Sequence, residues 1–335
     1  MTPETPWIAG AIAAALAVST LALLLRFAPR LPHDLPGLRS LHETPMPRVG
    51  GLAIWAGSLP IALAAPPAVP GPWSVWLLAT GLVAGVSLLD DCRGAHPAAR
   101  LASHFAAAVA VAIILVPSGP DRSQIATALA VGGGALLLVW AANLYNFMDG
   151  SDGLAAAMGV CGFGAYGIAA GLADAPAALY VGLAAATLPF LALNLPPARM
   201  FMGDVGAVPM GFLAAALGLG GWRTGTWPAW FPLLVFLPFI ADATVTLGKR
   251  IWRRERVWEA HKMHYYQRLH QRGAGHRGTL LVFGVLMSGT TASALATLVA
   301  DPGAGWVVIA VWSVAMAAIF SGIDYHWRHR TPAHR

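Results

Sequence analysis

Three short turns rich in aspartate interrupt an otherwise apolar chain. Asp90 and Asp91 stand in SLLDDCRG, Asp149 and Asp152 in NLYNFMDGSDGLA, and Asp204 in RMFMGDVGA. Charged side chains at membrane depth cost several kcal/mol unless they face a cavity or a partner. Carboxylates that converge would repel one another, and a divalent cation that prefers hard oxygen ligands would relieve this repulsion. The turns therefore predict a Mg²⁺ or Mn²⁺ site, and the alternative is that Asp and Asn merely cap helix ends.

The segment 248–278 collects positive charge and reads GKRIWRRERVWEAHKMHYYQRLHQRGAGHRG. Its residues His261, His264, Arg268 and Arg272 are spaced by three or four positions, so a helix would align them on one face. Such a row is suited to gripping a diphosphate from the side opposite a metal ion. The alternative is a basic helix lying on anionic lipid, which fits the three arginines within 253–256 better than it fits the histidines.

Four further polar residues are candidates for contacts with phosphate or nucleotide. The stretch RSLHETPMPRVGG contains His42 and Arg48, either of which would face a phosphate, although a loop rich in proline and glycine is usually only a connection. Arg100 follows the aspartate pair by two to three helical turns and would either meet a lipid phosphate or extend to the interface. Asp242 lies inside an apolar run, where an acid is a functional candidate by default or a partner of Lys249.

Membrane-spanning helices must position these turns. The 335 residues are 57% hydrophobic and 11% charged, whereas a soluble protein carries about 25% charged residues. We therefore expect an all-α integral membrane protein that forms one polytopic domain over residues 1–335, with the first apolar run retained as a span. About eleven runs have the length of a transmembrane helix, near 7–27, 49–66, 73–89, 101–117, 125–142, 154–173, 177–194, 206–221, 228–247, 279–299 and 304–322.

The distribution of lysine and arginine orients these helices. With the N-terminus periplasmic, and with Arg26 counted at the first boundary, the cytoplasmic segments near 28–48, 90–100, 143–153, 195–205, 248–278 and 323–335 hold 19 of the 21 basic residues. Because positive charge marks cytoplasmic loops, the C-terminus and the acidic turns are expected on the inner face of a bacterial inner membrane. The net charge of +6 then reflects topology and contact with anionic membrane lipids, and it does not indicate nucleic-acid binding.

The motifs LLDDCRG, NLYNFMDGSDGLA and FMGDVGA, followed by a histidine in the last inner loop, resemble the polyprenyl-phosphate N-acetylhexosamine-1-phosphate transferases. These are glycosyltransferases of the phospho-MurNAc-pentapeptide transferase type, and they include enzymes that start O-antigen and enterobacterial common antigen synthesis. The resemblance extends from about residue 39 to residue 278. It implies Mg²⁺-dependent transfer of a sugar-1-phosphate from a UDP-sugar to undecaprenyl phosphate, with release of UMP.

The resemblance also implies catalytic and metal-binding roles for five residues. Asp90 and Asp91 match an aspartate pair tied to the metal and to the acceptor phosphate, and His264 matches the first His of a His-x-His motif near the diphosphate. These three are the catalytic candidates. Asp204 matches a Mg²⁺ ligand, and Asn146 and Asp91 are expected to join it at the metal.

A second group of residues is expected to bind substrate. The resemblance places the first four of them around the uridine nucleotide, and the others are the basic residues described above. The group consists of Asn143, Asn146, Asp149, Asp152, Arg48, Arg100, His261, Arg268 and Arg272.

The chain departs from the family pattern at the last inner loop. In HKMHYYQRL, Tyr266 stands where the second His of His-x-His is expected. This pattern resembles the O-antigen and surface-glycan branch more than the peptidoglycan enzymes, and it favours a UDP-N-acetylaminosugar over UDP-MurNAc-pentapeptide. GlcNAc, GalNAc, FucNAc and QuiNAc all remain open as the sugar. His42 stands near the place where peptidoglycan members carry a basic residue close to the uracil.

The sequence leaves three questions open: the role of Asp90, the class of function and the oligomeric state. Asp90 either acts as a general base or positions substrate, and an acceptor phosphate with a second pKa near about 6 is already mostly dianionic at neutral pH. An ion-coupled transporter would also carry acids in an apolar bundle, but near the bilayer midplane and not at one edge. The oligomeric state is open between a monomer and a homodimer.

Overall fold

Helices make up nearly all of the described chain. The structure is a computed structural model that describes residues 5–36, 41, 44–117, 123–256 and 261–328. The first eight helices are α1 (Thr5–Arg26), α2 (Gly51–Ala64), α3 (Trp73–Arg93), α4 (Pro97–Leu115), α5 (Gln124–Met148), α6 (Leu154–Leu172), α7 (Ala178–Asn194) and α8 (Asp204–Arg223). The others are α9 (Trp230–Val235), α10 (Leu237–Trp252), α11 (Tyr265–Leu269), α12 (Gly275–Ala300) and α13 (Gly305–Arg328).

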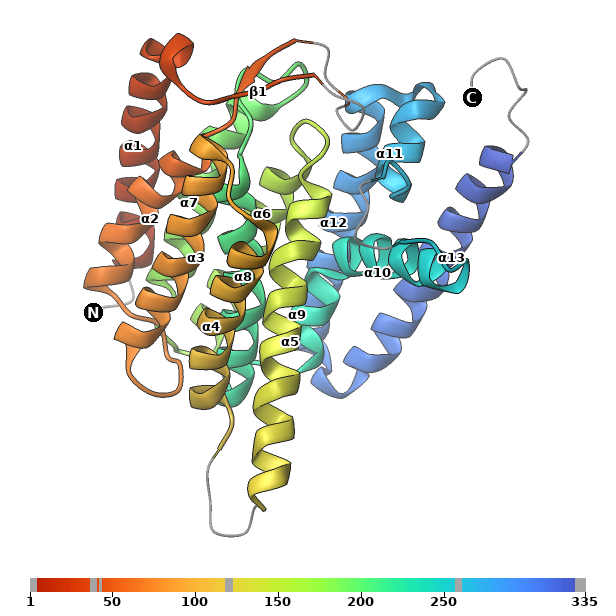
Figure 1. The fold of residues 1–335 in the computed structure, drawn as a ribbon. Helices are drawn as coiled ribbons and strands as arrows, with labels where there is room; N and C mark the ends of the chain where they lie inside the picture. The colour runs from red at the N-terminus through yellow and green to blue at the C-terminus, as the bar shows by residue number, and fades with distance from the viewer. Residues whose placement is uncertain (1–4, 37–40, 42–43, 118–122, 257–260, 329–335) are drawn as a thin grey trace.

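Short elements complete the described part of the chain. Three single turns of helix are η1 (Ala28–Arg30), η2 (His270–Ala274) and η3 (Pro302–Ala304). Two strands, β1 (His33–Asp34) and β2 (Met46–Pro47), pair antiparallel within the first predicted inner loop, with His33 opposite Pro47. This small ribbon lies at the end of the bundle toward which the acidic turns also point (Figure 1).

Eight helical stretches in the described residues are long and apolar enough to cross a membrane. They are α1, α3, α4, α5, α6, α8, the stretch Tyr265–Ala300 and the stretch Pro302–Trp327, and α2 and α7 are shorter apolar helices. Large apolar side chains such as Ile113, Leu129 and Val285 stay exposed on the outside of these helices. The prediction of an all-α integral membrane protein is confirmed, and the sides assigned to the two ends stay a prediction.

Helix α8 lies in the interior of the bundle, where it packs against α3 and α5. It is buried along most of its length. At its start, a Cβ atom on Gly51 of α2 would lie 2.3 Å from the Cα atom of Gly206, so the two backbones touch. Small residues allow this close approach between membrane helices. The packing holds the first turn of α8, which carries Asp204, against the inner-loop end of α2.

The ninth predicted span, near 228–247, is not one straight helix. The structure divides it at Phe236 into α9 and α10, and α10 lies across the bundle axis (Figure 1). Pro238 is one of the first two residues of α10, where the absence of its N–H costs nothing, whereas a continuous helix would lose a hydrogen bond there. The buried residues of α10 include Phe239, Asp242 and Thr246, a three-to-four spacing typical of one helix face.

Candidate active site

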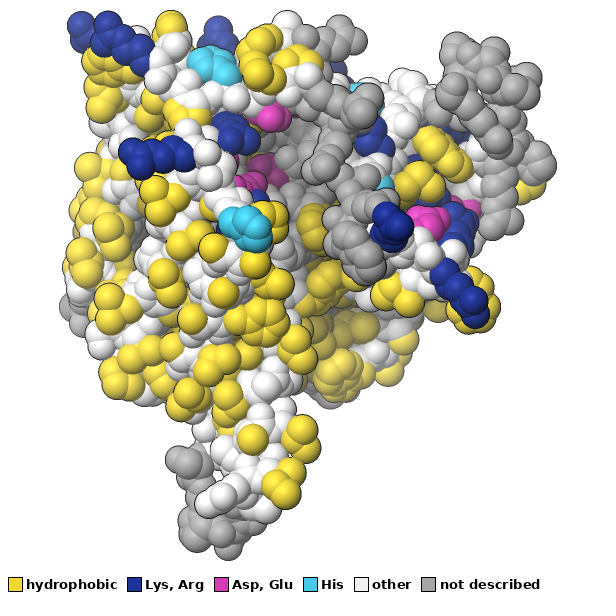
Figure 2. All heavy atoms as spheres, viewed as in Figure 1, with side chains coloured by type: hydrophobic (Ala, Val, Ile, Leu, Met, Phe, Trp, Pro, Cys, Tyr) yellow, Lys and Arg dark blue, Asp and Glu magenta, His cyan; other side chains and the backbone are white. Residues whose placement is uncertain are grey.

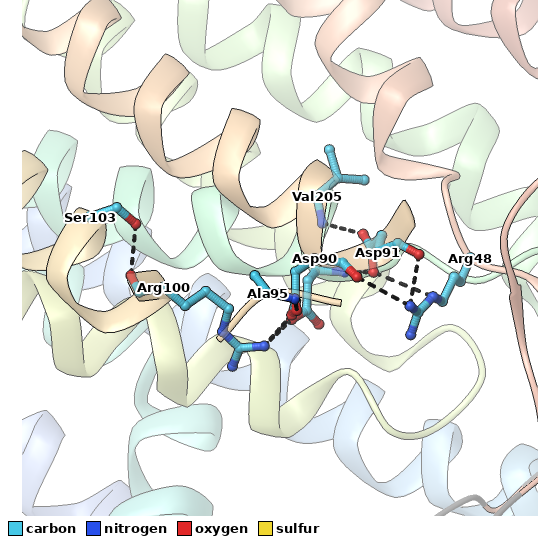
Figure 3. Close-up of polar contacts among 8 residues, drawn as sticks. Arg48, Asp90, Asp91, Ala95, Arg100, Ser103 and Val205 are labelled. Atoms are coloured by element: carbon cyan, nitrogen blue, oxygen red, sulfur yellow. Dashed lines mark hydrogen bonds and ion pairs between the residues drawn. The ribbon is translucent and has the colours of Figure 1, made fainter. Parts of the chain in front are cut away.

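Asp91 joins three parts of the chain that are distant in sequence. Its side chain, on the last turn of α3, is 3% exposed. The Oδ1 atom accepts a hydrogen bond from the backbone N–H of Asp204 at 3.2 Å, and Oδ2 accepts one from Val205 at 2.8 Å. Arg48 donates to the carbonyl of Asp91 at 2.8 Å, and its Nε lies 3.6 Å from Oδ1 (Figure 3). Asp91 therefore caps α8 and fixes Arg48 beside it.

Arg100 bridges the first and third acidic turns. Its Nη1 atom donates to the carboxylate of Asp90 and to Oδ2 of Asp204, the latter at 3.0 Å. Oδ1 of Asp90 also accepts from the backbone N–H of Ala95 at 2.7 Å (Figure 3). The first and third acidic turns therefore lie together, as predicted. In this structure the partners of Arg100 are the carboxylates of these two turns.

Gly203 allows the turn before α8 to pass beneath Arg48. Its φ of +73° is a left-handed conformation, and a Cβ atom would lie 1.9 Å from the carbonyl oxygen of Arg48. Residues with a side chain rarely adopt this conformation. The nearby Phe201 donates its backbone N–H to the carbonyl of Pro47 at 2.8 Å, and its own carbonyl accepts from the N–H of Gly50 at 2.9 Å. The backbone of Arg48 comes so close to this turn that only glycine fits at this position of the FMGD motif. His42, in the same predicted loop as Arg48, lies outside the described residues.

The second acidic turn adds a carboxylate with an unfavourable electrostatic environment. Asp149 follows α5 directly and is half-buried. Burial raises the pKa of Asp149 well above its usual range, and the charges of Asp204, Asp91 and Asp152 raise it further. Asn146 is also half-buried, and Asn143 donates to the backbone carbonyl of Val139 within its own helix at 2.8 Å. A bound cation would relieve the repulsion that acts on Asp149.

Asp152 fastens the second acidic turn to its surroundings. Its Oδ2 accepts from the backbone N–H of Ala198 at 2.9 Å, and Oδ1 lies 3.5 Å from Nδ1 of His276. Asn194 accepts from the N–H of Gly153 at 2.9 Å and donates to the carbonyl of Met200 at 2.9 Å. These contacts show a structural clamp, and the uridine role of Asp152 stays a prediction. Sequence reasoning missed Asn194 and His276, although an amide ending an apolar helix was a usable signal.

The predicted row of His261, His264, Arg268 and Arg272 does not share one helical face. Helix α11 begins only at Tyr265, so both histidines precede it. Arg268 is 3% exposed and donates to Oδ1 of Asp324 on α13 at 2.6 Å, whereas Arg272 is exposed in η2. The expectation of one aligned row was wrong, because backbone capping sets the start of the helix and Asp324 draws Arg268 toward α13.

His261 and His264 nevertheless lie together. Their ring centroids are 4.9 Å apart and the rings stack. Burial lowers the pKa of His261 to about 4, with further lowering by His264 and Arg250, so His261 is neutral at physiological pH. It can offer a hydrogen bond to a substrate but not a positive charge.

Asp242 pairs with His264, and the alternative of a pair with Lys249 was wrong. Lys249 instead contacts Asp324 and the hydroxyl of Tyr265. Oδ1 of Asp242 lies 3.2 Å from Nδ1 of His264. Tyr266, which replaces the second His of the motif, donates its hydroxyl to the carbonyl of Phe147 at 2.9 Å. The segment that carries His264 and Tyr266 thereby contacts the Asn-Asp motif directly.

The residues present suit a hard divalent cation in their chemistry. Their donors are carboxylate and amide oxygens, and the pKa of Asp149 is raised first by burial and then by the negative charges around it. Within the described ranges, no three acidic, histidine or cysteine side chains already stand together as a ready metal site. Arg100 lies between Asp90 and Asp204 and contacts Oδ2 of Asp204, so a metal ion at Asp204 would share that carboxylate with Arg100.

Viewed from the side, the molecule presents acidic side chains in a recess toward one end, beside basic and histidine side chains (Figure 2). Below this recess the surface is largely hydrophobic. Fold and site together define a multi-pass membrane protein with a polar, charged reaction site at one end of its helices.

Comparisons with known proteins point to one family of transferases. The model of glycosyl transferase family 4 matches residues 73–221, which include all three acidic turns. A probable undecaprenyl-phosphate N-acetylglucosaminyl 1-phosphate transferase of Bacillus subtilis is 28% identical over 264 residues, covering 74% of this chain and 72% of the relative. A decaprenyl-phosphate N-acetylglucosaminephosphotransferase of Mycobacterium leprae is 29% identical over 312 residues, covering 80% and 77%.

A shorter match reaches the peptidoglycan enzymes. The phospho-N-acetylmuramoyl-pentapeptide-transferase of Symbiobacterium thermophilum is 43% identical over 86 residues, which cover 24% of this chain and 26% of the relative. Over most of its length the chain is similar to the polyprenyl-phosphate hexosamine-1-phosphate transferases, and together with the match to glycosyl transferase family 4 this similarity supports that family for the chain. The matches and the apolar helices support a membrane-bound transferase.

Proposed function

We propose that this protein transfers an N-acetylaminosugar-1-phosphate from a UDP-sugar to undecaprenyl phosphate and so starts a lipid-linked surface glycan. The carrying observation is the convergence of Asp90, Asp91 and Asp204 around Arg48 and Arg100. Relatives named as N-acetylglucosamine-1-phosphate transferases support this class of donor. The bias of basic residues supports an inner-membrane enzyme whose site faces the cytoplasm, where nucleotide sugars are dissolved.

In the proposed reaction, an oxygen of the acceptor phosphate attacks the sugar-side phosphorus of the donor. A new P–O bond joins lipid phosphate to sugar phosphate, and the bond to UMP breaks, so that UMP leaves with the displaced oxygen. Phosphoryl transfer requires mainly in-line positioning and neutralisation of charge. Arg48 and Arg100 would supply positive charge, and His264 would donate to the diphosphate of the UDP-sugar.

A divalent cation fits this arrangement as a resident cofactor. Mg²⁺, or Mn²⁺ in its place, would neutralise charge on the diphosphate and on the leaving UMP. Asp204 and Asn146 would hold it, and Asp149 stands close enough to Asp204 for their charges to interact. Asp91 would contribute mainly by fixing the backbone of Asp204, since both of its oxygens already accept N–H groups of α8.

An apolar cavity of about 290 Å³ offers a route for the acceptor chain. Helices α5, α6, α8, α9 and α10 line it, with Trp140, Leu219 and Phe236 among the lining side chains. Tyr145 also lines it and lies one turn of α5 before Asp149. An isoprenoid chain in this cavity would bring its phosphate to the acidic turns while the chain stays out of water.

The purified protein should catalyse Mg²⁺-dependent exchange of labelled UMP into a UDP-sugar when polyprenyl phosphate is present. The donors to compare are the UDP-linked forms of GlcNAc, GalNAc, FucNAc and QuiNAc, with UDP-MurNAc-pentapeptide as the peptidoglycan alternative. Acceptors of different prenyl length test the role of the apolar cavity. Exchange with the pentapeptide donor alone would replace the surface-glycan proposal. Absence of exchange with every donor would reject the reaction and leave ion-coupled transport to be measured in vesicles.

Replacing Asp90 by asparagine should lower turnover by about 100-fold, the scale expected when a group that stabilises developing charge is lost. The loss should persist as the pH rises, because Asp90 positions Arg100 and the acceptor and the acceptor phosphate is already ionised. The measurement is the pH–rate profile of Asp90→Asn beside the parent. Full recovery over an increase of about two pH units would assign Asp90 as the general base, since hydroxide and a more ionised acceptor would replace it.

A further inference from the structure

Asp242 is a buried acid that none of the roles above requires. Its side chain is 0% exposed, at a depth where an unpaired carboxylate would be costly. It lies on α10, the helix that crosses the bundle, and it belongs to neither the three acidic turns nor the cluster around Arg100. Its hydrogen bonds therefore indicate what it stabilises.

Four donors from two segments converge on this carboxylate. Oδ1 accepts from the backbone N–H of Tyr265 at 2.9 Å, lies 3.2 Å from Nδ1 of His264, and accepts from the hydroxyl of Thr246 at 3.2 Å. Oδ2 accepts from the N–H of Tyr266 at 2.9 Å. The first N–H groups of a helix have no partner within it, so Asp242 caps the start of α11, together with Gln267, and holds His264 directly before it.

The contact also selects one tautomer of His264. A carboxylate with Nδ1 as its neighbour requires that nitrogen to carry a proton, and the other ring nitrogen, Nε2, then determines what the histidine can do for a substrate. Within the described residues Nε2 has no hydrogen-bond partner, and it is not among their fully buried unpaired atoms. The ring plane is held by stacking on Tyr266 at 5.9 Å and by Phe147 at 6.0 Å.

We propose that Asp242 is a positioning residue that accepts a hydrogen bond from Nδ1 of His264 and so directs Nε2 at the phosphates of the bound donor, where the ring donates as an imidazolium whose charge the Asp242 carboxylate balances. The same carboxylate caps the start of α11, and through Tyr266 it keeps this loop on the carbonyl of Phe147 in the Asn-Asp motif. The inference rests on the proposed function for its substrate. Asp242 lies outside the family motifs, and it acts on the reaction through the side chain of His264.

Asp242→Asn tests the proposal in the exchange assay. Asparagine offers one acceptor oxygen in place of two, so the donors of residues 264–266 cannot all be satisfied. Carboxylates that orient a histidine in metal sites contribute about 10- to 100-fold to activity, and we expect a fall in kcat in this range with a smaller change in KM. Thr246→Val is the matched control, because it removes a buried partner of Asp242 on α10 that does not touch His264, and it should stay within about twofold of the parent.

A double-mutant cycle separates positioning from a general loss of structure. If Asp242 acts through His264, the variant carrying both Asp242→Asn and His264→Ala should be no slower than His264→Ala alone. Losses that multiply, a fully active Asp242→Asn, or an equal loss in Thr246→Val would each overturn the proposal. Melting temperatures of all variants are recorded, and an Asp242→Asn defect that follows unfolding alone also counts against it.

A spectroscopic measurement keeps the inference testable without activity. In protein labelled with ¹⁵N-histidine, the His264 signals are assigned by their loss in His264→Gln, and they should show a proton on Nδ1 in the parent protein. Asp242→Ala should convert them to a mixture of tautomers. Unchanged signals in Asp242→Ala would overturn the contact, whereas inactivity of the parent protein towards every donor would reject the proposed function and leave this contact intact.

Discussion

Replacing Asp204 by alanine should reduce turnover by at least about 1,000-fold at every pH, because this carboxylate is expected to hold the cation that neutralises the diphosphate. The substitution also removes one of the two acids bridged by Arg100. Asp204 is the first residue of α8, and its backbone N–H still reaches Asp91 in the variant, so the fold should persist. The measurement is exchange of labelled UMP across a range of pH and Mg²⁺ concentrations.

Asp174→Asn provides the control for this prediction. Asp174 is an exposed acid with a φ of +52°, between α6 and α7, and asparagine tolerates that conformation. It should retain the activity of the parent protein. Near-normal turnover of Asp204→Ala would remove Asp204 from the metal site, and a return of activity at high Mg²⁺ alone would mean that other oxygens hold the cation.

Asp91→Asn should lower stability as well as turnover, whereas Asp90→Asn should lower mainly turnover. Asp91 supplies two acceptor oxygens to α8 and a negative charge to Arg48, and asparagine supplies only one acceptor. A buried N–H left without a partner costs about 1–3 kcal/mol, so the thermal midpoint in detergent should fall by several degrees. Turnover should fall with it, because Asp204 and Arg48 lose their common anchor.

The comparison with Asp90→Asn makes this prediction specific. Asp90 accepts one backbone N–H, and its side chain is 16% exposed, so its replacement should leave the thermal midpoint closer to that of the parent. Equal midpoints for Asp91→Asn and the parent protein would contradict the capping role of Asp91. A stability loss confined to Asp91→Asn would support it.

The sequence predicted the main features of the fold because lipid imposes strong rules on composition. Ten of the eleven apolar runs correspond to single helices, and the ninth corresponds to a broken pair. The break at Phe236 depends on how the amphipathic face of α10 packs, and hydrophobicity averaged over a window of residues does not report that packing. Pro238 was the local sign of it, since a proline favours the first turn of a new helix.

The site was predictable as a set of turns, but the partners of individual side chains were not. Topology places Asp90, Asp149 and Asp204 at one end of the bundle, and this much follows from alternating helices. Asp91 can cap α8 because Gly203, which has no side chain, lets the turn before α8 lie against the backbone of Arg48. That Arg268 faces Asp324 depends on the docking of α13, across 56 residues of sequence.

Helix α13 has a consequence for the order in which the enzyme becomes competent. Its Asp324 binds Lys249 and Arg268, and its Phe320 stacks on Tyr265 at 3.9 Å. Because α13 follows all three acidic turns in the chain, a nascent polypeptide with these turns already inserted still lacks the counterion for the buried Arg268 and for the half-exposed Lys249. Docking of α13 therefore secures the loop that carries His264, and we expect this loop to reach its final position only after α13 has inserted.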